Sequence, residues 1–367
     1  MMKIIENVTV VNADSTIECA DIYIENDKIS KIVAKEEQKA EKLAIPGFID
    51  THIHGFVGYD VMEGTKATEI ISENLAKYGV TSFMPTAMTN SWEKILASLN
   101  EISSNKKWVS KNLGLHIEGP YIGENKKGAH KSEWLLKASD ENLNQMYQAS
   151  NKMLRKISFD PKMVDLNVLK KMFDLNIIPS IGHSDASFDI SQEYFANGCA
   201  SVCHLWNAMS GVDSRKPGMA QAALMNPNVY TELIVDLNHV SAQTVKFTIQ
   251  NKGVDKVYCV SDAIKPAYGP NGDSISGGVA VIKQDLLITI KENGTIAGSG
   301  ITLYDSFKNI IKLGYSLQNA VALTSANVAT MMNLDLGAIK ENKIADLVIL
   351  DKKNLDILSV YVNGNKI

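Results

Sequence analysis

The sequence predicts a (β/α)8 barrel of the TIM type, with a small β-sandwich domain formed by both termini. Three observations predict it. In the central part of the chain, eight short apolar segments alternate with helical stretches, as in βα units around a parallel sheet. The two ends share a different pattern of short β-like runs and turn residues. Side chains that can bind metals recur at the ends of the predicted strands, where barrels of this type have their active sites.

The small β-domain is expected to comprise residues 1–45 and 337–367. The N-terminal part contains the runs KIIENVTVVN, DIYIEND and KISKIVA, and the C-terminal part contains ADLVILD and ILSVYVNGNKI. In these runs apolar and polar residues tend to alternate, and turn residues separate the runs, as is typical of half-buried strands. Because both ends show one pattern, they are expected to form one unit.

The barrel is expected over residues 46–336. Its predicted strands are, in order, GFIDTHIH, VTSFMPTA, LGLHIEG, LRKISFD, IIPSIGH, CASVCH, ELIVDLNH and KVYCVSD. Helical stretches include TKATEIISENLAKYG, KMVDLNVLKKMFDLN and SAQTVKFTIQNKG, the last of which ends on a glycine, as helix C-termini often do. Eight such units fit a closed barrel better than a doubly wound sheet. Residues 269–297 interrupt the alternation of strands and helices and are predicted to form an inserted β-hairpin.

The composition limits the classes of function. The chain has 367 residues, of which 45% are hydrophobic and 21% charged, which excludes collagen-like, disordered and membrane proteins. A net charge of −4 without a long basic run argues against nucleic acid or an anionic membrane as the main partner, so a small-molecule substrate is expected. Lys3 and Glu6 lie where a signal peptide would be apolar, so a cytoplasmic location is expected. The four cysteines, none in a C-x-x-C pair, are expected to be reduced core residues.

His52 and His54 end the first predicted strand. Side chains two residues apart on a strand point the same way, so both imidazoles are expected to face one point. Two converging neutral imidazoles suit a divalent transition metal. Taken alone, such a motif is more often a pair of hydrogen-bonded polar residues at the end of a strand.

Further potential ligands end other predicted strands. Glu118 ends the third strand, His183 the fifth, His204 the sixth and Asp262 the eighth. A single residue of this kind at the end of a strand more often has a structural role than a metal-binding one. Residues with unrelated roles, however, would not be expected to occur at the same end of several strands. Because the carboxyl ends of barrel strands meet at one face, the sequence predicts a metal site there.

Several motifs match a known family in order along the whole chain. They are PGFIDTHIHG, GLHIEGPYI followed by KKGAH, IGHSDA, CHLWNAMSG with RKPG, VSDA, AGS and KIADLVILD. By these motifs the chain resembles the amidohydrolase superfamily and, within it, the N-acetylglucosamine-6-phosphate deacetylase family. The resemblance implies a barrel of the amidohydrolase type and a hydrolase that converts N-acetyl-D-glucosamine 6-phosphate to D-glucosamine 6-phosphate and acetate, in amino-sugar catabolism and recycling.

The resemblance also implies the metal site. Glu118, with His183 and His204, corresponds to the site that the family generally keeps, and Glu118 stands where related enzymes often use a carbamylated lysine. A second metal can be held by His52, His54 and Asp262. One or two divalent ions per subunit, Zn2+ or Fe2+, are expected, as is a homodimer.

Catalytic roles follow from the same correspondence. Asp262 matches the residue that takes a proton from the attacking water and passes it to the departing amine. The alternative for Asp262 is a helix N-cap, because aspartate is a preferred cap residue. His130, in KKGAH, matches the residue that contacts the substrate amide and polarises its carbonyl.

The phosphate of the substrate is expected to bind at the motif HLWNAM and the loop after it. Asn207, the backbone N–H of Ala208, and Arg215 match the phosphate end of the family's site, and His239 matches a sugar-contacting histidine. Arg215 is one of only two arginines in the chain, and a guanidinium suits bidentate binding of an oxyanion; the alternative is a surface arginine. The family pattern is broken at Leu237, where glycine is usual.

Three other functions remain as alternatives. The substrate can be N-acetylgalactosamine 6-phosphate, or a phosphate-free cyclic amide or dipeptide as in dihydroorotases and dipeptidase-like enzymes; HLWNAM and Arg215 argue against the phosphate-free substrates. A catalytically inactive barrel, kept as an assembly or regulatory protein, would be expected to have lost ligands, yet the whole set is present. Metal content separates the inactive barrel from the enzymes.

Overall fold

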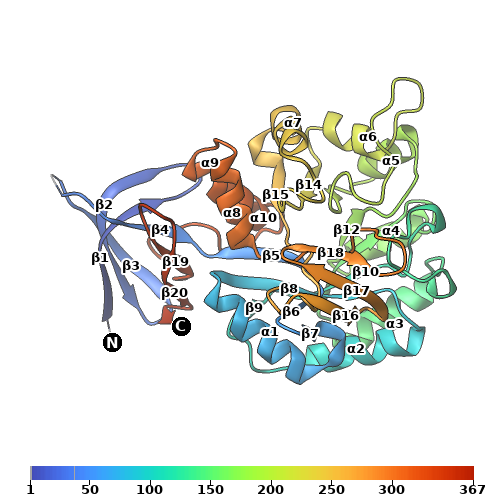
Figure 1. The fold of residues 1–367 in the computed structure, drawn as a ribbon, viewed down its shortest axis with the longest axis horizontal. Helices are drawn as coiled ribbons and strands as arrows, with labels where there is room; N and C mark the ends of the chain where they lie inside the picture. Colours follow the sequence, from blue (N-terminus) through green and yellow to red (C-terminus); the bar gives the residue numbers. More distant parts are fainter. Residues whose placement is uncertain (1, 37) are drawn as a thin grey trace.

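The computed structural model describes residues 2–36 and 38–367. A sheet formed by both termini lies beside a larger barrel (Figure 1). This sheet has seven strands in the order β21-β20-β19-β4-β1-β2-β3. Its strands are β1 (Met2–Val11), β2 (Thr16–Glu25), β3 (Lys28–Ala34), β4 (Lys42–Pro46), β19 (Leu347–Asp351), β20 (Ile357–Val362) and β21 (Asn365–Lys366). The two ends of the sequence thus meet through β4 and β19, which pair antiparallel.

The barrel sheet contains every predicted strand, in the order β15-β14-β13-β12-β11-β10-β8-β5, with β9 paired to β8. Its members are β5 (Phe48–Ile53), β8 (Val80–Met88), β9 (Lys111–Asn112), β10 (Leu115–Glu118), β11 (Leu154–Phe159), β12 (Ile178–Ile181), β13 (Ser201–Val202), β14 (Tyr230–Leu233) and β15 (Val257–Cys259). All the pairs are parallel, and a parallel bridge from Ile53 to Ala263 brings the two edges together. The predicted fold class, a (β/α)8 barrel with a β-domain from both termini, is confirmed.

Helices cover the barrel because their apolar faces pack on its strands. They are α1 (Thr65–Lys77), α2 (Trp92–Ser104), α3 (Asp140–Ala149), α4 (Leu166–Asp174), α5 (Phe188–Ala196), α6 (Met219–Met225), α7 (Ala242–Lys252), α8 (Leu303–Lys312), α9 (Leu317–Val321) and α10 (Asn327–Met331). Several begin at a side-chain cap; the Ser241 hydroxyl, for example, accepts a hydrogen bond from the Thr244 N–H. The predicted glycine at the end of α7 is Gly253, whose φ of 87° ends the helix. Within the described ranges, no helix combines the length and apolar character needed to cross a membrane.

The segment predicted as an inserted hairpin contains three antiparallel strands, β16 (Gly272–Ser276), β17 (Val279–Gln284) and β18 (Leu287–Ile290). The β16–β17 turn uses Gly277 and Gly278, both with positive φ, as tight hairpin turns require. A short pair, β6 (Gly55–Phe56) with β7 (Tyr59–Asp60), follows β5. The four cysteines are buried and free, as predicted.

Candidate active site

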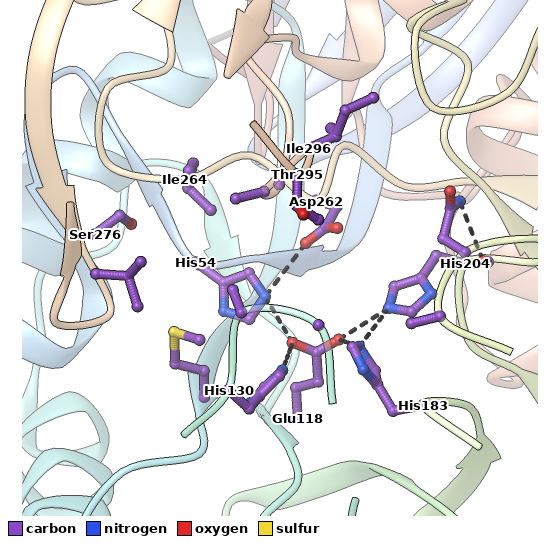
Figure 2. Close-up of a pocket in the computed structure, with 18 of the residues that line it drawn as sticks. His54, Glu118, His130, His183, His204, Asp262, Ile264, Ser276, Thr295 and Ile296 are labelled. Carbon is purple, nitrogen blue, oxygen red and sulfur yellow. Dashed lines mark hydrogen bonds and ion pairs between the residues drawn. The ribbon is translucent and has the colours of Figure 1, made fainter. Parts of the chain in front are cut away.

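A cavity of about 390 Å3 lies at the carboxyl ends of the barrel strands. Nine residues singled out in the sequence line it: His54, Glu118, His130, His183, His204, Asn207, Ala208, His239 and Asp262. The inserted segment and the chain around it provide an apolar wall that includes Ile264 and Ile296 (Figure 2). His52, which is fully buried, lies behind His54.

The first cluster of donor atoms is formed by Glu118, His183 and His204 (Figure 2). Glu118 Oε1 lies 3.1 Å from His183 Nε2 and 3.0 Å from His204 Nε2. The Nδ1 atom of His183 lies 2.8 Å from the carbonyl oxygen of Lys126, so it carries the proton and Nε2 presents its lone pair to the cluster. One carboxylate oxygen and two imidazole nitrogens are a ligand set that suits a divalent transition metal.

The second cluster is formed by His52, His54 and Asp262. The two histidine Nε2 atoms are 3.2 Å apart, and Asp262 Oδ1 lies 3.3 Å from His54 Nε2 and 3.6 Å from His52 Nε2. His54 Nδ1 is 3.0 Å from the carbonyl oxygen of Thr86, so its Nε2 is also free to bind a cation. Glu118 lies between the clusters, since its Oε2 is 3.3 Å from His54 Nε2.

These clusters attract positive charge. Burial alone would lower the pKa of His54 and His204, but contact with Glu118, and for His54 first with Asp262, raises the pKa of His54 to about 10 and that of His204 to about 9. Burial alone would raise the pKa of Glu118, but His183 and His52 hold that pKa well below its usual range. The clusters therefore contain buried carboxylates whose charge a divalent cation can neutralise.

Three residues of the site have a strained backbone. The φ angles of His183, Ala208 and Asp262 are 46°, 50° and 50°, a region that residues other than glycine seldom adopt. Such strain is common at functional sites, where surrounding structure must hold it. Asp262 follows β15 and precedes turns over 265–268 rather than a helix, and its side chain points to His54 (Figure 2).

Two further histidines have different surroundings. His130 lines the cavity with its Nε2 3.3 Å from Glu118 Oε2, while its buried Nδ1 has no partner among the described residues. His116 lies outside the cavity, where its ring nitrogens contact the hydroxyls of Thr86 (3.1 Å) and Ser158 (2.8 Å). His116 thus packs behind the site rather than facing its clusters.

The chain matches known proteins over almost its whole length. Residues 43–367 match the amidohydrolase family. An N-acetylglucosamine-6-phosphate deacetylase from Lysinibacillus sphaericus is 30% identical over 363 residues, which cover 95% of this chain and 94% of that protein. The chain belongs to the N-acetylglucosamine-6-phosphate deacetylase family of amidohydrolases. The resemblance found in the sequence is confirmed.

Other members of this deacetylase family and its relatives agree in length and fold. The crystal structure of the N-acetylglucosamine-6-phosphate deacetylase from Thermotoga maritima is 30% identical and superposes with a TM-score of 0.91 over 99% of each chain. An N-acetylgalactosamine-6-phosphate deacetylase from Escherichia coli O157:H7 is 29% identical over 340 residues, which cover 90% of this chain and 89% of that protein. The family likeness therefore extends over both the barrel and the terminal sheet.

Leu237 stands where the deacetylase family usually has glycine, yet His239 still lines the cavity. Leu237 has a φ of 64°, so it adopts the conformation that the usual glycine would favour. Asp236 holds the turn, because its carboxylate accepts hydrogen bonds from the backbone N–H groups of Asn238 and His239 and from the His239 ring (2.7 Å). His239 lines the cavity in this arrangement.

Arg215 is not brought to the cavity in this deacetylase-family chain. Its side chain is exposed, and its backbone N–H donates to Asp213 Oδ1 at 2.8 Å. Asn207 and Ala208, by contrast, are part of the cavity wall. The predicted role of Arg215 in binding phosphate stays a prediction.

Two buried charged residues next to the clusters were missed in the sequence. Lys156 and Glu232 lie on β11 and β14 and form an ion pair inside the barrel. Burial alone would raise the pKa of Glu232, but Lys156 and His52 hold that pKa well below its usual range. The available signal was a charge within an apolar strand, in LRKISFD and in ELIVDLNH.

Proposed function

We propose that this chain hydrolyses the acetamide of N-acetyl-D-glucosamine 6-phosphate, giving D-glucosamine 6-phosphate and acetate, by the residues named below. The observation that carries the proposal is the position of Asp262, whose carboxylate lies beside the histidine clusters and lines the same cavity as Glu118, His183 and His204. A ligand set and a proton carrier therefore face one space that can hold a substrate.

A cation held by Glu118, His183 and His204 would polarise the acetyl carbonyl and lower the pKa of a water towards about 7. We assign the ion as Zn2+ or Fe2+, because nitrogen and oxygen ligands of this kind suit both. His52, His54 and Asp262 supply the donors for a second ion. Whether one or two ions are present in the working enzyme is decided by metal analysis of the purified chain.

Asp262 carries the proton in the proposed reaction. Its carboxylate takes a proton from the attacking water as the water oxygen adds to the acetyl carbon. When the C–N bond breaks, Asp262 returns that proton to the sugar nitrogen, which leaves as an amine rather than as an unstable anion. His130 lines the same cavity and donates a hydrogen bond to the acetyl oxygen as negative charge develops on it.

The phosphate end of the substrate is assigned to the wall formed by Asn207 and Ala208. The Asn207 amide and the Ala208 N–H are donors, and His239 lies on the same cavity to contact the sugar. Arg215 follows in the loop that begins at Ala208, and its guanidinium must be brought to the cavity when substrate binds. A homodimer belongs to the same proposal and is tested by light scattering of the purified chain.

Acetate release from N-acetylglucosamine 6-phosphate tests the proposal, with metal content measured on the same sample. The unphosphorylated sugar and N-acetylgalactosamine 6-phosphate are the comparison substrates. The second sugar phosphate is included because a relative that is 29% identical is an N-acetylgalactosamine-6-phosphate deacetylase. Release that is as fast from the unphosphorylated sugar would contradict the phosphate assignment, and a chain without stoichiometric metal would contradict the mechanism.

A further inference from the structure

Lys156 and Glu232 are buried inside the barrel and have no role in the mechanism above. Both have an exposed fraction of 0%, and the ammonium and carboxylate are in direct contact. Burying two charges costs free energy, and replacing such a pair with apolar residues is often neutral or stabilising. Stability alone therefore does not explain the pair, which suggests a role in the adjoining site.

The Glu232 carboxylate accepts hydrogen bonds from four donors on different parts of the barrel. Its Oε1 accepts from the Lys156 ammonium and from the Tyr258 hydroxyl, at 3.1 Å for Tyr258. Its Oε2 accepts from His52 Nδ1 at 3.1 Å and from the backbone N–H of His204 at 3.1 Å. Oε1 is thus held by two side chains of the barrel interior. Oε2 contacts His52 of the second cluster and His204 of the first.

The contact with His52 decides which ring nitrogen faces the cavity side. In a neutral imidazole one nitrogen donates and the other accepts, so donation from Nδ1 to Glu232 leaves the Nε2 lone pair beside His54. Without Glu232, the remaining neighbour of Nδ1 is the Cys203 thiol at 3.7 Å, a weaker acceptor. Lys156 also donates to the carbonyl oxygen of Thr51 at 3.3 Å, which fixes the strand residue before His52.

We propose that Glu232, held in place by Lys156, is a positioning residue for the cation site: it fixes the donor nitrogen of His52 and the backbone of His204. The inference rests on the proposed function in taking the two clusters as a cation site. Removing a carboxylate that orients a ligating histidine typically lowers metal affinity about 10-fold to 100-fold. A single carboxylate joined to both clusters is expected to act on both.

The test is the affinity of the purified chain for Zn2+ and Co2+, measured by competition with a coloured chelator. The variant Lys156→Met with Glu232→Leu removes both charges and fills the space with apolar side chains. If the pair only supports the fold, cation affinity stays as in the wild type, whatever happens to thermal unfolding. We expect instead a folded protein whose Zn2+ affinity falls about 10-fold to 100-fold, with a changed visible spectrum of bound Co2+. Wild-type affinity together with an unchanged spectrum would overturn the proposal.

A second pair of variants keeps the test decisive if the double variant does not fold. Glu232→Gln preserves the shape, and we expect weaker Zn2+ binding and faster loss of Zn2+ to the chelator. Tyr258→Phe is the matched control, because it removes a donor to Oε1 and leaves both Oε2 contacts in place; its affinity should equal that of the wild type. Equal losses in both variants would overturn the positioning role. Absence of stoichiometric metal in the wild type would instead contradict the proposed function.

Discussion

His183 Nε2 and His204 Nε2 lie 3.1 Å apart, with Glu118 Oε1 at hydrogen-bond distance from both. Because His183 donates its other ring proton to the Lys126 carbonyl, its lone pair points at the second imidazole. Neutral nitrogens in this arrangement repel each other unless a proton or a cation lies between them. The pair is therefore the part of the site whose geometry most directly calls for a bound cation.

Glu118→Gln should remove the bound metal and the activity together. The amide keeps the shape of the side chain but loses the charge that faces both clusters, so the primary set no longer has an anionic ligand. Metal analysis and acetate release on one sample check this outcome. Full metal content in Glu118→Gln would contradict the assignment of the primary site.

The double variant His52→Asn with His54→Asn should lose at most a second ion and keep measurable turnover. These residues belong to the second cluster, whereas Glu118 and its two histidines remain intact. The measurement is metal per chain before and after substitution, beside the rate of acetate release. If this variant lost all its metal while Glu118→Gln kept its metal, the second cluster would be the primary metal site.

The sequence was sufficient to predict the barrel and the clusters because both follow from local rules. Apolar runs of strand length predict the strands, and a parallel barrel brings their carboxyl ends to one face, so the sequence alone predicts that Glu118 and His183 lie together. The contact between Lys156 and Glu232 could not be predicted this way. These residues lie on β11 and β14, which are not neighbours in the sheet, so their contact depends on the curvature of the closed barrel.

The surroundings of the cavity were less predictable than its ligands. The inserted segment was predicted to be a two-stranded hairpin, whereas the structure has three antiparallel strands there. The third strand, β18, is only four residues long, and its residue pattern does not distinguish it from β17. The position of Arg215 depends on an exposed loop, whose path is not set by an alternating or helical pattern. Loop residues that belong to the family motifs, such as His130 and Asn207, do line the cavity, whereas Arg215 does not.

Asp262→Asn should separate proton transfer from metal binding. The amide keeps the size of the side chain but cannot accept the proton, and general acid–base groups typically contribute about 100-fold to 10,000-fold. We expect turnover to fall at least about 100-fold while the ion held by Glu118, His183 and His204 remains. Turnover within a few-fold of the wild type would leave Asp262 without a catalytic role. His116→Asn is the control, because His116 lies behind the site and outside the cavity. It shows how much turnover changes when a nearby buried residue with no proton-transfer role is replaced.

Lys252 gives a prediction for stability against pH. Its ammonium is buried on α7 and donates to the carbonyl oxygen of Ala223 at 2.7 Å. Burial lowers the pKa of Lys252 from its ordinary value of 10.5 to about 8, and nearby Lys256 acts in the same direction. Between these values the unfolded chain binds a proton that the folded chain lacks, so the contribution of Lys252 to the free energy of unfolding rises as pH rises through this window.

Urea unfolding of the wild type and Lys252→Met at pH 7.5 and 9.5 measures this dependence. The free energy of unfolding of the wild type minus that of the variant should be larger at pH 9.5 than at pH 7.5. Lys246→Met, on the exposed face of the same helix, is the control for loss of a charge. A difference that is the same at both pH values would contradict the lowered pKa.

Arg215→Ala should weaken catalysis on the phosphorylated sugar through KM. If the guanidinium binds the phosphate equally in the ground and transition states, its loss raises KM and leaves kcat nearly unchanged. Charge-assisted hydrogen bonds contribute about 1.5–3 kcal/mol, so kcat/KM should fall about 10-fold to 150-fold. Arg215→Lys should recover part of this loss, because an ammonium lacks the bidentate geometry. Reaction with the unphosphorylated sugar should hardly change, so the decisive quantity is the ratio of kcat/KM for the two sugars.

The chain offers a matched control for this prediction in its only other arginine. Arg155 is at the start of β11, away from the cavity, and its guanidinium donates to the carbonyl oxygen of Asn176 at 2.8 Å. Arg155→Ala removes the same charge and side chain, so it should leave the ratio for the two sugars as in the wild type. If both variants lower the ratio equally, the effect comes from net charge rather than from a phosphate contact. If neither does, Arg215 is a surface residue, and the phosphate must be bound by Asn207 and Ala208 without a guanidinium.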